Sequence, residues 1–436
     1  MVVDCKISKN KKDYTEAKLL EVKQLPSEEK LSTSVCKHYK EECGGCRWSI
    51  LCYSSQIELK KQLIQDSFWK LNNYLFKGKD IISSERKRKY RNKVEFSFWK
   101  IFPEQQWNFG YHKQGFFYKV IDVERCYLVS EKMHKVFEYM KEIFKKSWLP
   151  VYDQKTHKGF FRHLVIRYWY WTDQLMLNIS VADNNIEDSS DYKQSWQDLK
   201  NMILEDKFIE ENVDSFYVTY NNQYSDAVKS EWNEIQLLKW NPVIEEKLSI
   251  GERNVFFNIS PFSFFQTNTV QAQNLFDKAL KQIEGKSKGV LIDLYCGTWT
   301  IGLSFLASWN FEKLIWVDIS SSNIEDAREN AKINWLENKA EFVCEKAEKY
   351  IFDEEFEDRE LTVVVDPPRD GLHKNVVKSL IELKNKKDFS IIYISCNPVT
   401  LARDLWLFLE KFEIQDYYFF DMFPQTYHIE SLFYLK

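Results

Sequence analysis

The chain has 436 residues, of which 44% are hydrophobic and 29% charged, and its formal net charge is −4. This composition is typical of a soluble globular protein with two or three domains, and the net charge excludes a globally basic nucleic-acid binder. No apolar run is long enough to span a bilayer, and the first residues contain no apolar signal core, so we expect a cytoplasmic protein. In a reducing compartment the nine cysteines are expected to be core residues, metal ligands or reactive thiols.

The predicted elements begin with a polar, lysine-rich stretch over residues 1–35, which we interpret as a mobile tail. Residues 36–255 start with a group of cysteines and continue with a helix over roughly 55–75. Short spans such as VEFSF, HLVIRYWY and QLMLNISV then alternate polar and apolar residues, which predicts antiparallel strands, and a helix over 131–146 interrupts them. The segment RKRKYRNK (86–93) has six basic residues among eight, and charge alone assigns it to a solvated loop.

Residues 256–436 alternate apolar strand-like runs with helices. The runs are VLIDLY, KLIWVDI, LTVVVD and SIIYIS, and the helical stretches include 323–334 and 399–412. This alternation predicts an α/β fold with a doubly wound parallel sheet. In such sheets, ligands bind beyond the carboxyl ends of the strands.

Polar motifs follow these runs at the edge where ligands bind. They are DLYCG (293–297), Asp318, DPPR (366–369) and SCNP (395–398). Asp318 lies 21 residues after Gly297, a distance at which a carboxylate can accept hydrogen bonds from ribose hydroxyls. Each motif alone is compatible with a helix cap or a turn. Together, at successive strand ends, they predict a nucleoside-binding site.

Cys396 and Glu430 form a candidate catalytic pair. Cys396 is expected at a strand tip, although a lone cysteine is more commonly a buried core residue. Glu430 precedes the last apolar run, which would return it to the same edge. A thiolate that adds to C6 of uracil makes C5 nucleophilic, and a base must then remove the C5 proton before the thiolate leaves. Asp366 would orient the uracil edge, and the target base must leave the stack to be reached.

These motifs resemble those of the RNA 5-methyluridine (uracil-C5) methyltransferase family. The resemblance rests on SPFSFFQTN (260–268), DLYCG, DPPRDGL (366–372), SCNPVTLARDL (395–405) and FPQTYHIE (423–430), and extends upstream through YRNKVEFSF, GYHKQGFF, RHLVIR and YSDAV. It covers nearly all of residues 36–436. It implies a class I (Rossmann-like) S-adenosylmethionine methyltransferase domain over 256–436 and a β-rich, RNA-binding middle domain carrying a cysteine cluster. We also expect the helix over 55–75 to pack on the catalytic domain.

The resemblance implies that Cys396 is the nucleophile and Glu430 the base. It also implies that a further set of residues lines the cofactor and uracil site: Gln266, Tyr295, Thr300, Asp318 and Asp366.

A cysteine run near the start of the middle domain has the spacing of a metal site. Cys36, Cys43 and Cys46 supply three thiols, and Cys52 or Cys126 is the candidate fourth ligand. Spacing alone fits zinc as well as iron–sulfur. Family members that methylate bacterial 23S rRNA have a similar run and a distant fourth cysteine that together bind a [4Fe–4S] cluster. That resemblance implies Cys126 as the fourth ligand and a structural or RNA-contacting role for the cluster.

Two kinds of RNA are candidates for the target. The cysteine run points to 23S rRNA, whereas only about 35 residues precede Cys36, too few for the OB-like domain of the family's rRNA members. A tRNA T-loop uridine is therefore the alternative. We expect a monomer with no membrane partner. Two rival functions are a catalytically inactive RNA-binding or ribosome-assembly relative and an amino-group methyltransferase, since a D-P-P motif also suits exocyclic nitrogens.

Tryptophan is unusually frequent and glycine unusually rare, with 15 tryptophans against 12 glycines. In the family, the loop after DLYCG has a second glycine where this chain has Trp299. Similar exchanges occur at Trp99, Trp148, Trp240, Trp316 and Trp335. Three explanations compete: a catalytically inactive relative, a remodelled pocket, or UGA codons that the source organism reads as glycine. We favour the third hypothesis, because UGA differs from the glycine codon GGA by one base.

Overall fold

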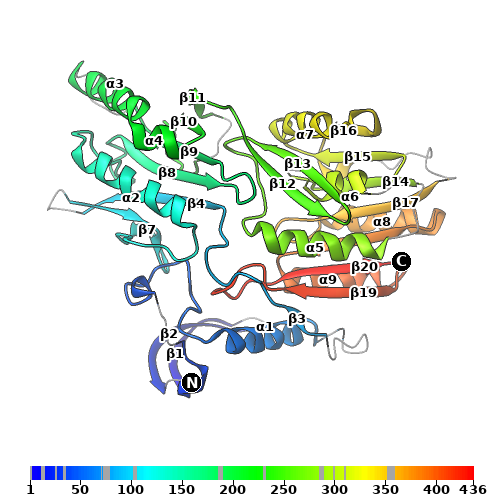
Figure 1. The fold of residues 1–436 in the computed structure, drawn as a ribbon. Helices are drawn as coiled ribbons and strands as arrows, with labels where there is room; N and C mark the ends of the chain where they lie inside the picture. The colour runs from blue at the N-terminus through cyan, green and yellow to red at the C-terminus, as the bar shows by residue number, and fades with distance from the viewer. Residues whose placement is uncertain are drawn as a thin grey trace.

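Figure 1 shows the fold as a computed structural model, with the C-terminal domain on the right and the middle domain at the upper left. A hairpin from the N-terminus lies at the bottom. The structure describes the whole chain except residues 1, 11–14, 25–26, 33–35, 70, 72–78, 102–105, 185–189, 229–231, 284–288, 298–299, 309–310 and 351–358. Within this described part, no helix is both long and apolar enough to cross a bilayer.

The C-terminal domain is built on a sheet whose described strands lie in the order β16-β15-β14-β17-β18-β20-β19-β3. The parallel strands are β14 (Gly289–Leu294), β15 (Lys313–Asp318), β16 (Ala340–Cys344), β17 (Glu360–Val365) and β18 (Ser390–Ser395). At one side, β20 (Glu430–Leu435) runs antiparallel to β18 and to β19 (Ile414–Phe420), and β3 (Ile81–Ile82) is parallel to β19. The parallel strands confirm the predicted doubly wound α/β sheet.

Helices cover both faces of this sheet, which is why its central strands are nearly continuous runs of buried apolar residues. Leu291 of β14 packs in one core with α5, α6 and α7. Its neighbour Ile292 packs in the opposite core with α8, α9 and the earlier helix α1 (Tyr53–Ser67). The bounds of the helices after the middle domain are α5 (Thr269–Gln282), α6 (Thr300–Ser308), α7 (Ser321–Ile333), α8 (Lys374–Lys386) and α9 (Pro398–Phe408).

The hairpin of β12 (Ile244–Ile250) and β13 (Arg253–Ile259) belongs to the C-terminal domain. Its inward residues Leu248 and Phe257 are buried in the same core as α5. The strand β12 packs on α5, and β13 packs on α6 and α7. The boundary predicted at residues 255–256 is therefore wrong. Sequence placed it there because the alternating pattern of β12 resembles that of the middle-domain strands.

The middle domain contains a sheet with the order β11-β10-β9-β8-β4-β5. Its strands are β4 (Lys93–Lys100), β5 (Trp107–Gly110), β8 (Phe161–Tyr168), β9 (Leu175–Val181), β10 (Ser215–Tyr220) and β11 (Glu234–Trp240), and a separate pair is formed by β6 (His112–Lys113) and β7 (Phe116–Val120). Its helices are α2 (Glu131–Lys146), α3 (Ser190–Glu205) and α4 (Lys207–Asn212). The helix predicted over 131–146 is confirmed. The expectation of antiparallel strands is wrong for β9 and β10, which are parallel because α3 and α4 connect them.

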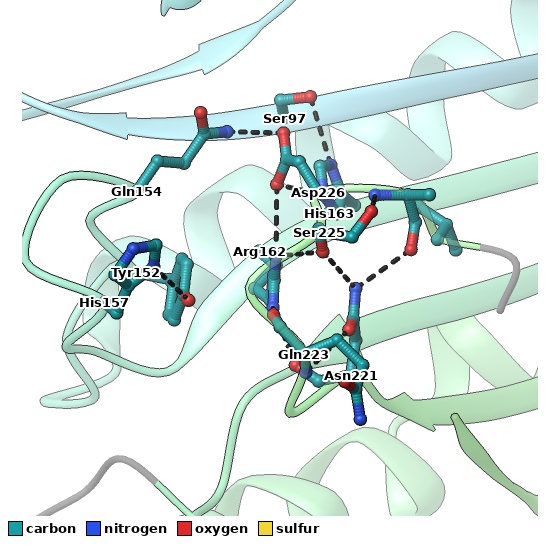
Figure 2. A network of polar contacts seen from close by, with 12 residues as sticks. Ser97, Tyr152, Gln154, His157, Arg162, His163, Asn221, Gln223, Ser225 and Asp226 are labelled. Carbon is teal, nitrogen blue, oxygen red and sulfur yellow. Dashed lines mark hydrogen bonds and ion pairs between the residues drawn. The ribbon is translucent and has the colours of Figure 1, made fainter. Parts of the chain in front are cut away.

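A buried polar network fixes the loop that follows β10 (Figure 2). Arg162 on β8 donates hydrogen bonds to the main-chain carbonyls of Asn221 and Ser225, at 2.8 and 2.7 Å. Its neighbour His163 contacts the carboxylate of Asp226 at 3.0 Å. The RHLVIR and YSDAV segments thus meet in space, and their polar residues shape the middle domain.

The first residues form a hairpin and not the polar tail predicted for residues 1–35. The strand β1 (Val2–Asn10) pairs antiparallel with β2 (Thr15–Gln24). Val3, Cys5 and Ile7 recur at alternate positions, which is the period of a strand. The sequence interpretation missed this alternation because lysine dominates the composition of the segment.

Helix α1 (Tyr53–Ser67) lies on the C-terminal domain, as expected for the helix predicted over 55–75. Ile64 and the following Phe68 are buried in its core, and the Phe68 ring lies 5.8 Å from that of Phe433 on β20. The helix ends at Ser67, earlier than predicted, and residues 72–78 lie outside the described part of the chain.

Two tryptophans have backbone angles that favour glycine. Their φ angles are +68° at Trp240 and +59° at Trp335, and a left-handed residue with a side chain costs about 1–2 kcal/mol. Trp335 follows α7 where a Schellman turn ends the helix, since the Leu336 amide donates to the carbonyl of Ala331 at 2.9 Å. These angles support the hypothesis of glycine at positions 240 and 335. Trp299 lies outside the described residues.

Candidate active site

A cavity of about 410 Å³ opens at the carboxyl edge of the C-terminal sheet, where β14, β17 and β18 end. This volume lies in the range of small-molecule sites. The cavity brings together most of the site residues predicted from sequence: Gln266, Tyr295, Thr300, Asp366, Cys396 and Glu430. Residues that sequence reasoning did not single out also line it, among them Phe264, Arg369 and Phe423. Each of these three lies within a motif that was noted, so the motif was the available signal.

Cys396 lies between the end of β18 and the start of α9. The next residue, Asn397, caps α9, because its side-chain oxygen accepts a hydrogen bond from the amide of Val399 at 3.1 Å. The side-chain nitrogen of Asn397 donates to the carbonyl of Arg369 at 2.9 Å. These bonds fix the Cys396 backbone against the DPPR loop, so the thiol faces the cavity as a strand-tip residue.

The acidic groups that line the cavity have strongly raised pKa values. Burial raises the pKa of Asp366 to about 7. Burial, followed by the negative charge of Asp366, raises the pKa of Glu430 well above that of an ordinary carboxyl. Burial and then the charges of Glu430 and Asp366 raise the pKa of Cys396 to about 12, while Arg369 acts in the opposite direction. A carboxyl group whose pKa is raised toward neutrality is suited to proton transfer.

Asp318 lies beside the cavity but does not line it. Its carboxylate accepts hydrogen bonds from the amides of Gly297 and Ser320, at 3.0 and 2.8 Å, and from the side-chain nitrogen of Asn323 at 3.1 Å. Each carboxylate oxygen can accept more than one hydrogen bond, so these bonds leave capacity for a ligand. Nearby, Oδ1 of the buried Asp293 has no hydrogen-bond partner among the described residues. The remaining acceptor capacity of Asp318 at the strand end fits a ligand with hydroxyl donors.

Helix α1 fixes the segment that precedes Glu430. Lys60 and Asp421 form an ion pair in which both side chains are fully buried. One turn earlier, the side chain of Gln56 accepts a hydrogen bond from the amide of Gln425 at 2.9 Å. Glu430 is therefore positioned by a helix that lies far away in sequence, and no motif predicted these contacts.

The predicted metal ligands Cys36, Cys43, Cys46 and Cys126 line one cavity of about 40 Å³ in the middle domain. Burial, and after it the neighbouring thiols of Cys126 and Cys36, raise the pKa of the Cys43 thiol to about 11. Among the described residues, no set of three His, Cys, Asp or Glu side chains is arranged to hold a single metal ion.

Three further cysteines lie outside this group. The thiol of Cys52 lies 3.1 Å from the hydroxyls of Ser54 and Ser55 and does not line the cysteine cavity, so Cys52 is not the fourth member of the group. Cys296 packs against the core of the C-terminal domain and also lines the large cavity. Cys344 is exposed, because it ends the outermost strand β16.

Comparison with known proteins identifies relatives along the whole chain. A family model described as tRNA (Uracil-5-)-methyltransferase matches residues 227–436. A protein of Caldanaerobacter subterraneus named as an RNA methyltransferase is 33% identical over 430 residues, which are 98% of this chain and 90% of that protein. One of Staphylococcus aureus, also named as an RNA methyltransferase, is 32% identical over 440 residues, covering 100% and 91%.

A solved structure shares the fold. The Pyrococcus abyssi tRNA (uracil-54, C5)-methyltransferase in complex with S-adenosyl-L-homocysteine matches with a TM-score of 0.69 and 28% sequence identity. The match covers 91% of this chain and 86% of that chain.

Proposed function

Because this chain belongs to the RNA (uracil-5-)-methyltransferase family and is an RNA methyltransferase, we propose that it methylates carbon 5 of a uridine through a covalent bond to Cys396. S-adenosylmethionine is the proposed methyl donor, which the large cavity and the neighbour bound to S-adenosyl-L-homocysteine support. The observation that carries the proposal is the convergence of a thiol and two carboxyl groups, from Cys396, Asp366 and Glu430, on one cavity.

In the proposed reaction, the Cys396 thiolate adds to C6 of the flipped uracil, and the electron pair of the C5–C6 bond moves toward C5 and O4. Asp366 holds the uracil edge by hydrogen bonding. C5 then bonds to the methyl group, and the donor leaves as S-adenosylhomocysteine. Glu430 removes the C5 proton, the C5–C6 double bond forms again, and the thiolate of Cys396 leaves.

The product tests this proposal directly. Purified protein is incubated with RNA and S-adenosylmethionine, and the RNA is digested to nucleosides. We expect 5-methyluridine from the wild-type protein and none from Cys396→Ala. Methylation of a base amino group instead would support the amino-group methyltransferase alternative and contradict the proposal.

We propose 23S rRNA as the substrate, on the strength of the cysteine group and its resemblance to rRNA-modifying relatives. A tRNA T-loop uridine is the second candidate, favoured by the similarity to the Pyrococcus abyssi enzyme. Mapping 5-methyluridine in both RNAs of a deletion strain separates them. Loss from rRNA alone supports the first candidate, and loss from tRNA alone contradicts it.

We also propose that Cys36, Cys43, Cys46 and Cys126 hold a [4Fe–4S] cluster. The support is that these thiols share one buried cavity, where burial and mutual repulsion disfavour free thiolates. A cluster uses four thiolates around several iron atoms, whereas zinc needs them around a single ion. Protein purified without oxygen should contain iron and sulfide and lose both in Cys126→Ser. Zinc, or no metal, would contradict the cluster.

A further inference from the structure

A series of aromatic rings leads out of the large cavity. Phe423 lines the cavity with Glu430, and its ring lies 6.0 Å from that of His428. The His428 ring lies 4.3 Å from the ring of Tyr427, which is 40% exposed. Tyr427 in turn lies 6.5 Å from Trp48. The rings therefore connect the cavity that contains Glu430 to the exposed Tyr427 and to Trp48, which follows the cysteine group.

Positive charge accompanies these rings. The guanidinium of Arg47 lies 5.8 Å from the centre of the Tyr427 ring. Burial, and after it the charges of Arg369 and Lys60, lower the pKa of His428 to about 4. His428 is therefore neutral at pH 7, so that its ring remains a stacking surface in a positive field.

The basic segment 86–89 continues the same surface. The side chain of Gln425, two residues before Tyr427, donates a hydrogen bond to the carbonyl of Lys87 at 3.5 Å. The guanidinium of Arg86 lies 3.6 Å from the centre of the exposed Tyr170 ring. The hydrogen bond between Gln425 and Lys87 thus brings the Arg47–Tyr427 pair and the Arg86–Tyr170 pair into one region of the molecule.

The cations at the centre of this surface are not neutralised by neighbours. Arg47, Arg86 and Lys87 form no ion pair with any described residue, whereas Lys89 is paired with Glu131. The net charge of the chain is −4, so these cations run against the overall balance. We call the set Arg47, Arg86, Lys87 and Tyr427 the basic–aromatic strip.

We propose that the basic–aromatic strip binds unpaired nucleotides of the RNA that flank the target uridine. The base of a neighbouring nucleotide stacks on Tyr427, and its phosphates contact Arg47, Arg86 and Lys87. Alternating cations and exposed rings fit single-stranded RNA, because its phosphates and base faces are both accessible. In a duplex the base faces are stacked and inaccessible, and an acidic protein has no base faces that could stack on Tyr427. The inference rests on the proposed function and narrows its substrate to looped or single-stranded RNA.

The phosphate contacts are tested by binding at several salt concentrations. The probe is a fluorescent RNA hairpin with one uridine in its loop, followed by fluorescence anisotropy. For Arg86→Gln/Lys87→Gln we expect weaker binding and a slope of log K against log salt that is shallower by about 1.4, since each lost contact to a single strand removes about 0.7. The matched control, Lys378→Gln/Lys386→Gln on α8, removes the same charge and should leave the slope unchanged.

The stacking contact is tested with the same hairpin carrying 2-aminopurine beside the uridine. Binding of the wild-type protein should quench its fluorescence, and Tyr427→Leu should abolish the quenching and weaken binding by about 5- to 100-fold. Tyr427→Phe should restore both. Wild-type affinity in the double cation variant together with unchanged quenching in Tyr427→Leu would overturn the proposal.

The two proposals can fail separately. Wild-type protein that binds the hairpin through the strip, but forms 5-methyluridine in no RNA, would contradict the proposed function and support the strip. Full methylation of the hairpin, with an affinity that the strip substitutions do not change, would support the proposed function and contradict the strip. Equal affinity for the hairpin and for a fully paired duplex of the same length would contradict the preference for unpaired nucleotides.

Discussion

Replacing Glu430 by glutamine separates the formation of the proposed covalent adduct from its breakdown. Glu430 is 3% exposed and lines the same cavity as Cys396. The substitution keeps the shape of the side chain but removes its ability to accept a proton. General bases contribute about 10²- to 10⁴-fold to a rate, so we expect turnover to fall by about that factor.

The same substitution should leave the first half of the reaction intact. After burial, the charge of Glu430 is the largest cause that raises the pKa of the Cys396 thiol. Glutamine removes this charge, so the thiolate forms more readily and addition to C6 is not slowed. The methylated adduct, which cannot lose its C5 proton, should therefore accumulate.

The assay follows labelled RNA on a denaturing gel. Glu430→Gln should give a slowly migrating protein–RNA band that carries the methyl label, while the wild-type protein turns over without one. Glu410→Gln, an exposed carboxyl near the end of α9, is the matched control and should behave as the wild type. Wild-type turnover in Glu430→Gln, or slow turnover with no adduct, would refute the assignment of Glu430 as the base.

The other predictions concern charge, packing and backbone strain. Arg369 lowers the pKa of Cys396. Arg369→Gln should therefore raise this pKa and shift the rising limb of the kcat/KM profile to higher pH, measured over about pH 6 to 9. An unchanged profile would argue against thiolate chemistry. Lys60→Met leaves Asp421 buried and unpaired, which should lower the free energy of unfolding by about 3–5 kcal/mol in urea titrations. In recombinant protein made with tryptophan, Trp335→Gly should raise the free energy of unfolding by about 1–2 kcal/mol. Mass spectrometry of the native protein should find glycine at residue 335, and tryptophan there would reject the codon hypothesis.

The motifs at the strand ends predicted most of the residues that line the large cavity. Parallel strands end at one edge of a sheet, so the acids and the thiol that follow them had to converge, and Asp366 and Cys396 do so. Asp318 was placed correctly at the edge, but sequence could not show that backbone amides already occupy part of its carboxylate.

Contacts between segments that lie far apart in the chain could not be predicted from the sequence. A lysine such as Lys60 is normally expected on the solvated face of a helix. The fold shows that Lys60 is buried and that Asp421 compensates its charge. The basic segment 86–89 likewise read as a solvated loop, because no pattern connects it with Gln425. The hairpin at residues 2–24 was missed for a related reason, since each strand gains its stability from the other.

The most direct test of the account is the identity of the residue that bonds to RNA. RNA containing 5-fluorouridine presents a fluorine at C5 that Glu430 cannot remove as a proton, so the adduct should persist after methyl transfer. Digestion and mass spectrometry should then find the modified nucleotide on the peptide that contains Cys396. A nucleotide bound to another residue, or no covalent complex from an enzyme that forms 5-methyluridine, would contradict covalent catalysis by Cys396.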